Sequence, residues 1–136
     1  MRSGSQHHAD YCREQFRRGS EALTILLAVD DDDAPVGKVH LDFEAREHEN
    51  AALLLAAAVI PALQGRGVGT QLIAAAEHLG CVRGLETVVL GVEDSNPRAR
   101  RLYERLGYVV VGADDFVYVG APVPNPAVWM RKELRC

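Results

Sequence analysis

Cysteine is scarce in this sequence, and the three that occur, Cys12, Cys81 and Cys136, form no close pair. An odd and unpatterned set argues against a disulfide framework and against a zinc site. We therefore interpret Cys81 as a packing residue of a helix and the other two as residues near the chain ends, and we expect no metal.

The sequence also lacks an apolar run long enough for a membrane span. Its longest run, residues 51–63, is shorter than the roughly 20 residues that cross a bilayer. The N-terminus has no apolar stretch of the kind found in secretory signals. These features predict a cytoplasmic protein with no membrane partner.

Positive charge is in deficit, since the formal net charge is -4 and the pI is near 5.7. This balance disfavours nucleic acid as the main partner. The acidic run 30–33 is typical of a solvated hairpin turn, and attraction of a cationic acceptor is the alternative. A chain of 136 residues, 48% hydrophobic and 25% charged, is predicted to form one domain, residues 1–136, with a single core.

Apolar periodicity predicts the order of helices and strands. Helices are expected over residues 9–18, from 68 to about 80, and between Asn96-Pro97 and Gly107; strands are expected over 22–29, 36–43, 51–60, 86–92, 108–112 and 127–133. In residues 36–43, Val39, Leu41 and Phe43 are expected on one face, and Lys38, His40 and Asp42 on the other. The order suits an α/β (α+β) protein whose helices pack on a mixed sheet.

Glycines at 65, 67 and 69 follow the apolar strand 51–60 and precede a helix. Backbone N–H groups at such a bend reach a ligand without side chains in the way, and the helix N-terminus attracts phosphate. Arg66 adds a charged contact. The segment predicts an anion-binding turn, with a tight structural turn as the alternative. Its spacing fits neither a nucleotide-triphosphate loop nor a dinucleotide fingerprint.

Gln64, Gly67 and Gly69 fill the pattern Q/R-x-x-G-x-G/A, which resembles motif A of the GNAT superfamily of N-acetyltransferases. Residues 92–112, VEDSNPRARRLYERLGYVVVG, resemble motif B of that family. The resemblance covers roughly residues 22–133. It implies a mostly antiparallel sheet that splays at its central strands, with helices on both faces.

The resemblance also implies a site for acetyl-CoA as cosubstrate. The residues it assigns to the cofactor are Val59, Gln64, Gly65, Arg66, Gly67, Val68, Gly69, Thr70, Asn96 and Tyr103. In this assignment the Val59 N–H stabilises the oxyanion, and Tyr103 protonates the leaving thiolate as general acid. Alternatives stay open: Tyr103 as a core tyrosine, and Asn96 as no more than a helix N-cap.

The sequence departs from the family pattern in two places. The strand 51–60 contains no Glu or Asp to serve as base, so Glu93 and His40 are the candidate bases, each equally explained as an edge or surface residue. Residues 1–20 form a shortened N-terminal segment, which leaves open a missing first strand and helix and a homodimer that covers the exposed edge.

Two functions follow from the resemblance. The leading prediction is transfer of an acetyl group from acetyl-CoA to a primary amine of a small molecule or a protein. The alternative is a non-catalytic acyl-CoA-binding or regulatory module. Motifs A and B concern only the acetyl donor, so the sequence does not identify the acceptor. Asp114 and Asp115 would suit a cationic amine.

Overall fold

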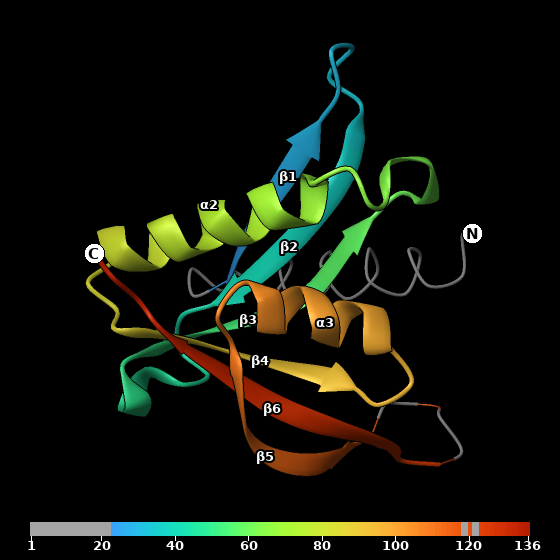
Figure 1. The fold of residues 1–136 in the computed structure, drawn as a ribbon. Helices are drawn as coiled ribbons and strands as arrows, with labels where there is room; N and C mark the ends of the chain where they lie inside the picture. The colour runs from blue at the N-terminus through green and yellow to red at the C-terminus, as the bar shows by residue number, and fades with distance from the viewer. Residues whose placement is uncertain (1–22, 118–119, 121–122) are drawn as a thin grey trace.

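A computed structural model of the protein describes residues 23–117, 120 and 123–136 as a six-stranded sheet with helices α2 and α3 packed on it (Figure 1). The strands are β1 (Leu23–Val29), β2 (Pro35–Asp42), β3 (Ala51–Val59), β4 (Thr87–Glu93), β5 (Val109–Phe116) and β6 (Asn125–Glu133). The helices are α2 (Val68–Val82) and α3 (Pro97–Arg105), with 3-10 turns η1 (Glu47–Glu49) and η2 (Pro61–Leu63). The helix expected over residues 9–18 lies outside the described residues.

The strands follow the order β1-β2-β3-β4-β6-β5, and all neighbours are antiparallel except β3 and β4. The predicted mixed α/β fold is therefore confirmed. Strands β5 and β6 are longer than expected, because the pairing extends through Asp114 and Asp115 to Phe116. Strand β5 lies at the sheet edge, where polar side chains reach solvent, so its period does not reveal its full length.

The sheet opens between β3 and β4. These strands pair only over four residues each, Ala51–Leu54 with Thr87–Leu90. Beyond this point β4 keeps its pairing with β6, while β3 follows β2. Two residues of β3, Ala56 and Ala57, face one residue of β2, and Ala56 has a φ of 54°. Such a bulge bends its strand, which carries the end of β3 away from β4.

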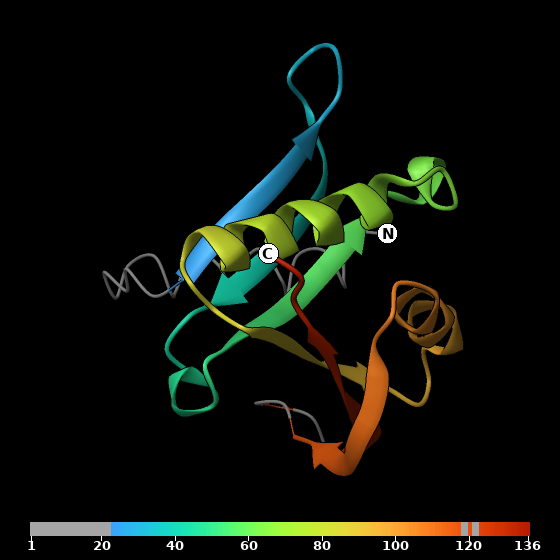
Figure 2. The ribbon, with the colours of Figure 1, turned by 60° about the vertical axis from the view of Figure 1, so that its left-hand side comes forward.

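Helices α2 and α3 lie on the same face of the sheet (Figures 1 and 2). Tyr108 lies between them, because its hydroxyl donates to Glu77 of α2 and its ring meets Tyr103 of α3 edge-on at 5.9 Å. The apolar stripes of both helices join the inward side chains of β2, β3 and β4 in one core. That core includes Val39 and Leu41, as their alternation predicts. The expectation of helices on the second face falls on residues outside those that the structure describes.

His40 corrects one expectation from the sequence. Its place on the polar face of residues 36–43 allowed a surface location, but the side chain is 0% exposed. Strand β2 is an inner strand between β1 and β3, and Val39, His40 and Leu41 are buried in succession. Alternating polarity did not translate into alternating exposure, because both faces of this strand are covered here.

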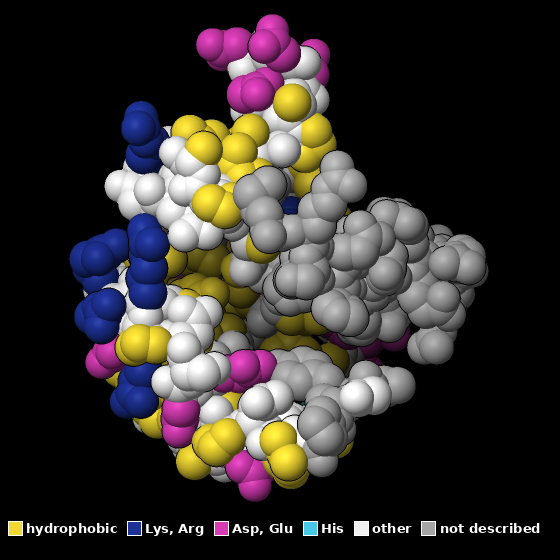
Figure 3. All heavy atoms as spheres, turned by 90° about the vertical axis from the view of Figure 1, so that its right-hand side faces the viewer, with side chains coloured by type: hydrophobic (Ala, Val, Ile, Leu, Met, Phe, Trp, Pro, Cys, Tyr) yellow, Lys and Arg dark blue, Asp and Glu magenta, His cyan; other side chains and the backbone are white. Residues whose placement is uncertain are grey.

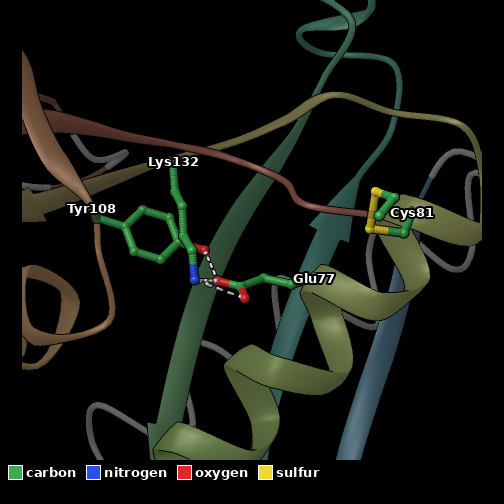
Figure 4. A network of polar contacts seen from close by, with 5 residues as sticks. Glu77, Cys81, Tyr108 and Lys132 are labelled. Atoms are coloured by element: carbon green, nitrogen blue, oxygen red, sulfur yellow. Dashed lines mark hydrogen bonds and ion pairs between the residues drawn. A yellow bond between two sulfur atoms is a disulfide. The ribbon is translucent and has the colours of Figure 1, made fainter.

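The cysteines supply a second correction, because Cys81 and Cys136 form a disulfide across 55 residues of sequence (Figure 4). The interpretation of Cys81 as a packing residue alone is therefore wrong. Strand β6 and the residues after it bring Cys136 to the C-terminal end of α2, a proximity that cysteine spacing does not reveal. Disulfides are uncommon in a reducing cytoplasm, and the cytoplasmic location stays a prediction. In the described segments no helix is long and apolar enough to cross a membrane.

Candidate active site

The bend between β3 and α2 depends on glycine for its shape. Gly65 has a φ of 76°, and Gly67, the N-cap of α2, has a φ of 87°. Residues with a Cβ rarely adopt this left-handed region, so glycine is required at both positions. A Cβ on Gly69 would instead meet Leu102 of α3 at 3.5 Å, so this glycine lies where the two helices approach. Two of the three glycines thus shape the bend, and the third faces the neighbouring helix.

The N–H groups of this bend have no acceptor among the residues that the structure describes. The first backbone hydrogen bond of α2 runs from the Gln71 N–H to the Gly67 carbonyl at 3.0 Å. Within the part of the chain that the structure describes, no hydrogen bond starts at the N–H groups of residues 65–70. Unpaired donors at a helix N-terminus carry a partial positive charge and bind anions. The bend therefore presents N–H donors without a partner in the described chain, and anion binding there stays a prediction.

The N–H group of Val59 points into the opening between β3 and β4. The Ile60 N–H bonds the Val36 carbonyl at 2.9 Å, which makes that pair a hydrogen-bonded pair of the β2–β3 ladder. The next pair, Val59 with Gly37, is then a non-hydrogen-bonded pair, whose N–H and C=O groups point away from the partner strand. The Val59 carbonyl accordingly accepts from the Gln64 side chain at 3.0 Å.

Gln64 connects the bend to both neighbouring elements. Its amide nitrogen donates to the Val59 carbonyl, and its amide oxygen accepts from Arg98 of α3 at 3.3 Å. A Cβ on Gly65 would lie 3.2 Å from the Arg98 guanidinium. Both ends of the Gln64 amide are thus used inside the protein, and Arg98 lies directly beside the glycine bend. This gives Gln64 a positioning role that the sequence pattern did not indicate.

The opening forms a cleft of about 810 Å³ between the end of β3, the glycine bend and α3. Its more buried part is apolar, with Ala58, Leu72 and Ile73 among the lining residues. Its outer part carries Arg98, Arg101 and Arg105 of α3, and none of its described lining residues is Asp or Glu. Figure 3 shows Lys and Arg side chains gathered on one side of the molecule, away from the acidic tip of the β1–β2 hairpin. The cleft thus suits a ligand with an anionic head and an uncharged arm.

Tyr103 lines the cleft from the apolar face of α3 and is 8% exposed. Burial raises the pKa of its hydroxyl, so the phenol keeps its proton at neutral pH. Among the described residues the Tyr103 hydroxyl has no hydrogen-bond partner, although its ring packs against Tyr108. Tyr103 is therefore a nearly buried, protonated phenol among the residues that line the cleft.

Asn96 begins α3 as predicted. Its side-chain oxygen accepts from the Ala99 N–H at 3.2 Å, and Pro97 occupies the first helical turn. Asn96 also lines the cleft, and among the described residues its amide nitrogen has no hydrogen-bond partner. The cap is confirmed, and contact with the cofactor stays a prediction.

A model of the acetyltransferase (GNAT) family matches residues 2–108, more than half of the sequence. This chain belongs to the GNAT acetyltransferase family. Mycothiol acetyltransferase of Mycobacteroides abscessus is 50% identical over 56 residues, which are 41% of this chain and 19% of that protein. The enzyme of the same name from Streptosporangium roseum is 44% identical over 72 residues, covering 52% and 21%. The chain thus spans only a small part of these relatives.

Solved structures show the same GNAT fold. Nourseothricin acetyltransferase has a TM-score of 0.75 at 24% identity, covering 85% of this chain and 67% of that chain. Spermidine N-acetyltransferase from Vibrio cholerae, in complex with CoA and spermine, has a TM-score of 0.75 at 23% identity, covering 92% and 75%. At these identities the comparison carries the fold, and the site residues rest on the geometry above.

Several residues that the GNAT motifs suggested do not line the cleft. Arg66 is exposed on the bend, and the Val68 side chain packs against the core. Neither candidate base lines the cleft: His40 is buried in β2, and Glu93 at the end of β4 accepts from Ser95 at 3.3 Å. The general base is therefore unassigned.

Sequence reasoning missed the three arginines that form the outer wall of the cleft. The signal was present, because Arg98, Arg101 and Arg105 are spaced by three and four residues, as are the members of one helix face. The sequence interpretation of this helix used its apolar stripe and did not consider its arginines. Only the fold shows that the arginine face of α3 borders the glycine bend of this GNAT domain.

Proposed function

We propose that this GNAT domain transfers an acetyl group from acetyl-CoA to a primary amine of a small molecule or a protein. The carrying observation is the cleft itself. It combines unused N–H groups at the head of α2, an open backbone edge at Val59 and a protonated Tyr103 hydroxyl. Coenzyme A has an anionic head and an uncharged arm, and the solved neighbours include complexes with CoA and acetyl-CoA.

The proposed reaction is direct attack of a neutral amine on the thioester carbon. A C–N bond forms, and the carbonyl oxygen becomes an oxyanion that accepts from the Val59 N–H. The C–S bond then breaks, and the departing thiolate takes a proton from the Tyr103 hydroxyl. The ammonium nitrogen of the intermediate gives up its proton to water, and the tyrosinate regains one. No covalent enzyme intermediate is needed.

The test is release of free CoA thiol on incubation with acetyl-CoA and a panel of amines. Spermine, an aminoglycoside and a peptide with an N-terminal alanine cover the acceptor types that the names of the solved neighbours contain. We expect Tyr103→Phe to lower kcat about 100-fold and to leave the Kd for acetyl-CoA nearly unchanged. Tyr108→Phe is the matched control, because it removes a tyrosine hydroxyl that bonds Glu77 instead of facing the cleft.

A non-catalytic acyl-CoA-binding module is the second candidate, favoured by one observation. Neither Glu93 nor His40 lines the cleft, and among the described residues no carboxylate does. Tight binding of acetyl-CoA without thiol release on any amine would favour this module. Equal turnover of Tyr103→Phe and the parent protein would remove Tyr103 from the mechanism. Calorimetry that detects no binding of coenzyme A would reject both functions.

A further inference from the structure

The charged residues of α3 are sorted onto two faces. Arg98, Arg101 and Arg105 lie on the face that borders the cleft. Arg100 does not line the cleft and pairs instead with Glu104, one turn further along, at 3.7 Å. The two sets are interleaved in the sequence, yet only one of them faces the cleft. We call Arg98, Arg101 and Arg105 the binding wall. Arg100, on the other face of the same helix, serves as a control position.

The binding wall holds positive charge that the protein itself does not neutralise. Within the described ranges, the side chains of Arg101 and Arg105 form neither an ion pair nor a hydrogen bond. No acidic residue of these ranges lines the cleft. Like charges at this spacing on a helix repel one another. Such an arrangement is unfavourable alone and becomes favourable when an anion binds across it.

The glycine bend and this wall occupy different places along the cleft. Arg98 lies beside Gly65, so it belongs with the N–H groups that would bind a diphosphate. Arg101 and Arg105 lie roughly one and two helical turns further along α3, at a pitch of about 5.4 Å per turn. A ligand that fills both places needs a second anionic group set apart from its diphosphate. Coenzyme A has one such group, the phosphate on the 3′-oxygen of its ribose.

We propose that Arg101 and Arg105 bind the 3′-phosphate of coenzyme A and so select it over 3′-dephospho-CoA. This inference rests on the proposed use of acetyl-CoA and names residues that distinguish two forms of that ligand. Arg98 has a separate task, since it holds Gln64 and the bend against α3. Planar guanidinium groups bind a phosphate through paired hydrogen bonds, which suits them to a monoester at the rim of an open cleft.

The test is calorimetric titration with CoA and with 3′-dephospho-CoA at about 0.15 M salt, where charges more than about 8 Å apart are largely screened. The parent protein should bind CoA at least about 10-fold more tightly than dephospho-CoA. The double variant Arg101→Gln/Arg105→Gln should lose about 10-fold to 100-fold in affinity for CoA and less than about 3-fold for dephospho-CoA. Arg98→Gln should weaken both ligands by similar factors.

Arg100→Gln is the matched control, because it removes one arginine from the same helix without touching the cleft, and it should leave both affinities unchanged. Equal binding of the two ligands by the parent protein would overturn the assignment. So would a double variant that loses affinity for both ligands by the same factor. If the parent protein binds neither ligand, the proposed function itself fails. The substituted arginines of the cleft are exposed, so we expect each variant to fold, and circular dichroism verifies this.

Discussion

The two ends of helix α2 contrast in how their polar groups are used. At the N-terminal end, the N–H groups of residues 65–70 have no partner within the described chain, and the bend is exposed. At the C-terminal end, Glu77 binds both Tyr108 and Lys132, and Cys81 is joined to Cys136 (Figure 4). The N-terminal end thus has donors without acceptors among the described residues. The C-terminal end is fixed by a hydrogen bond, an ion pair and a disulfide.

This contrast separates binding from stability. Donors left open to a ligand contribute nothing to the folded state until the ligand binds, so stability must come from elsewhere. The C-terminal end supplies stability in two ways. The carboxylate of Glu77, which pairs with Lys132, is partly buried. The disulfide restricts the conformations of the unfolded chain. Changes at the two ends should therefore act on different measurements.

The largest effect is expected from the disulfide. Cys136→Ala opens a loop of 55 residues, which should lower the free energy of unfolding by up to about 4 kcal/mol. Affinity of the folded protein for acetyl-CoA should stay the same, because the bond lies at the far end of α2. Urea unfolding with and without reductant measures the first quantity, and calorimetry the second. If the urea midpoint of the parent protein were the same with and without reductant, the disulfide would not be formed in solution.

The ion pair at Glu77 should have the next largest effect. Glu77→Gln removes the charge opposite Lys132, whose nitrogen lies 3.0 Å away, and should cost about 2 kcal/mol of unfolding free energy. Glu104→Gln is the matched substitution, because its pair with Arg100 lies in solvent and should contribute under about 0.5 kcal/mol. Equal losses in the two variants, measured by urea unfolding, would show that burial at the C-terminal end does not strengthen its pair.

A pair of glycines compares the two ends directly. Gly67 and Gly84 flank α2 with φ values of 87° and 78°, and a Cβ on either would meet no atom within 4 Å. Alanine at either position should therefore cost a similar amount, about 1 kcal/mol, through backbone strain alone. Only Gly67→Ala should also weaken acetyl-CoA binding, by roughly 10-fold, because relief of the strain moves the N–H groups of the bend. Similar affinities in both variants would remove the bend from the site.

The smallest effect concerns the Tyr108 hydroxyl. Tyr108→Phe removes its bond to Glu77 and should cost about 1 kcal/mol near pH 8. Burial and the nearby Glu77 raise the pKa of Tyr108 far above its ordinary 10.0. Its contribution is therefore fully present below pH 10 and declines as the pH rises above 10, where the unfolded tyrosine loses its proton first.

Urea unfolding between pH 9 and pH 11 checks this sign. The parent protein should lose stability with rising pH more steeply than Tyr108→Phe, by as much as about 1.4 kcal/mol per pH unit. The comparison cancels the contributions of ionisable groups that both proteins share and that do not contact Tyr108. Parallel pH profiles would mean that Tyr108 titrates alike in the folded and unfolded chains.

Local patterns in the sequence predicted much of the fold and part of the site. Helices α2 and α3 begin and end near the predicted caps, because Asn96, Pro97 and the glycines act on neighbouring backbone. The glycine bend was predicted for the same reason. The burial of His40 was not, since it depends on what covers both faces of β2, and the Cys81–Cys136 bond depends on where a distant strand ends.

The sequence by itself determined where the chain turns, which segments are helix or strand, and that a glycine bend precedes α2, because these features arise from residues within a few positions of one another. Only the tertiary structure decided that β3 leaves β4 after Leu54, that Arg101 and Arg105 face the resulting cleft, and that two distant cysteines join. These features depend on contacts between residues far apart in the sequence, which periodicity and propensity do not describe.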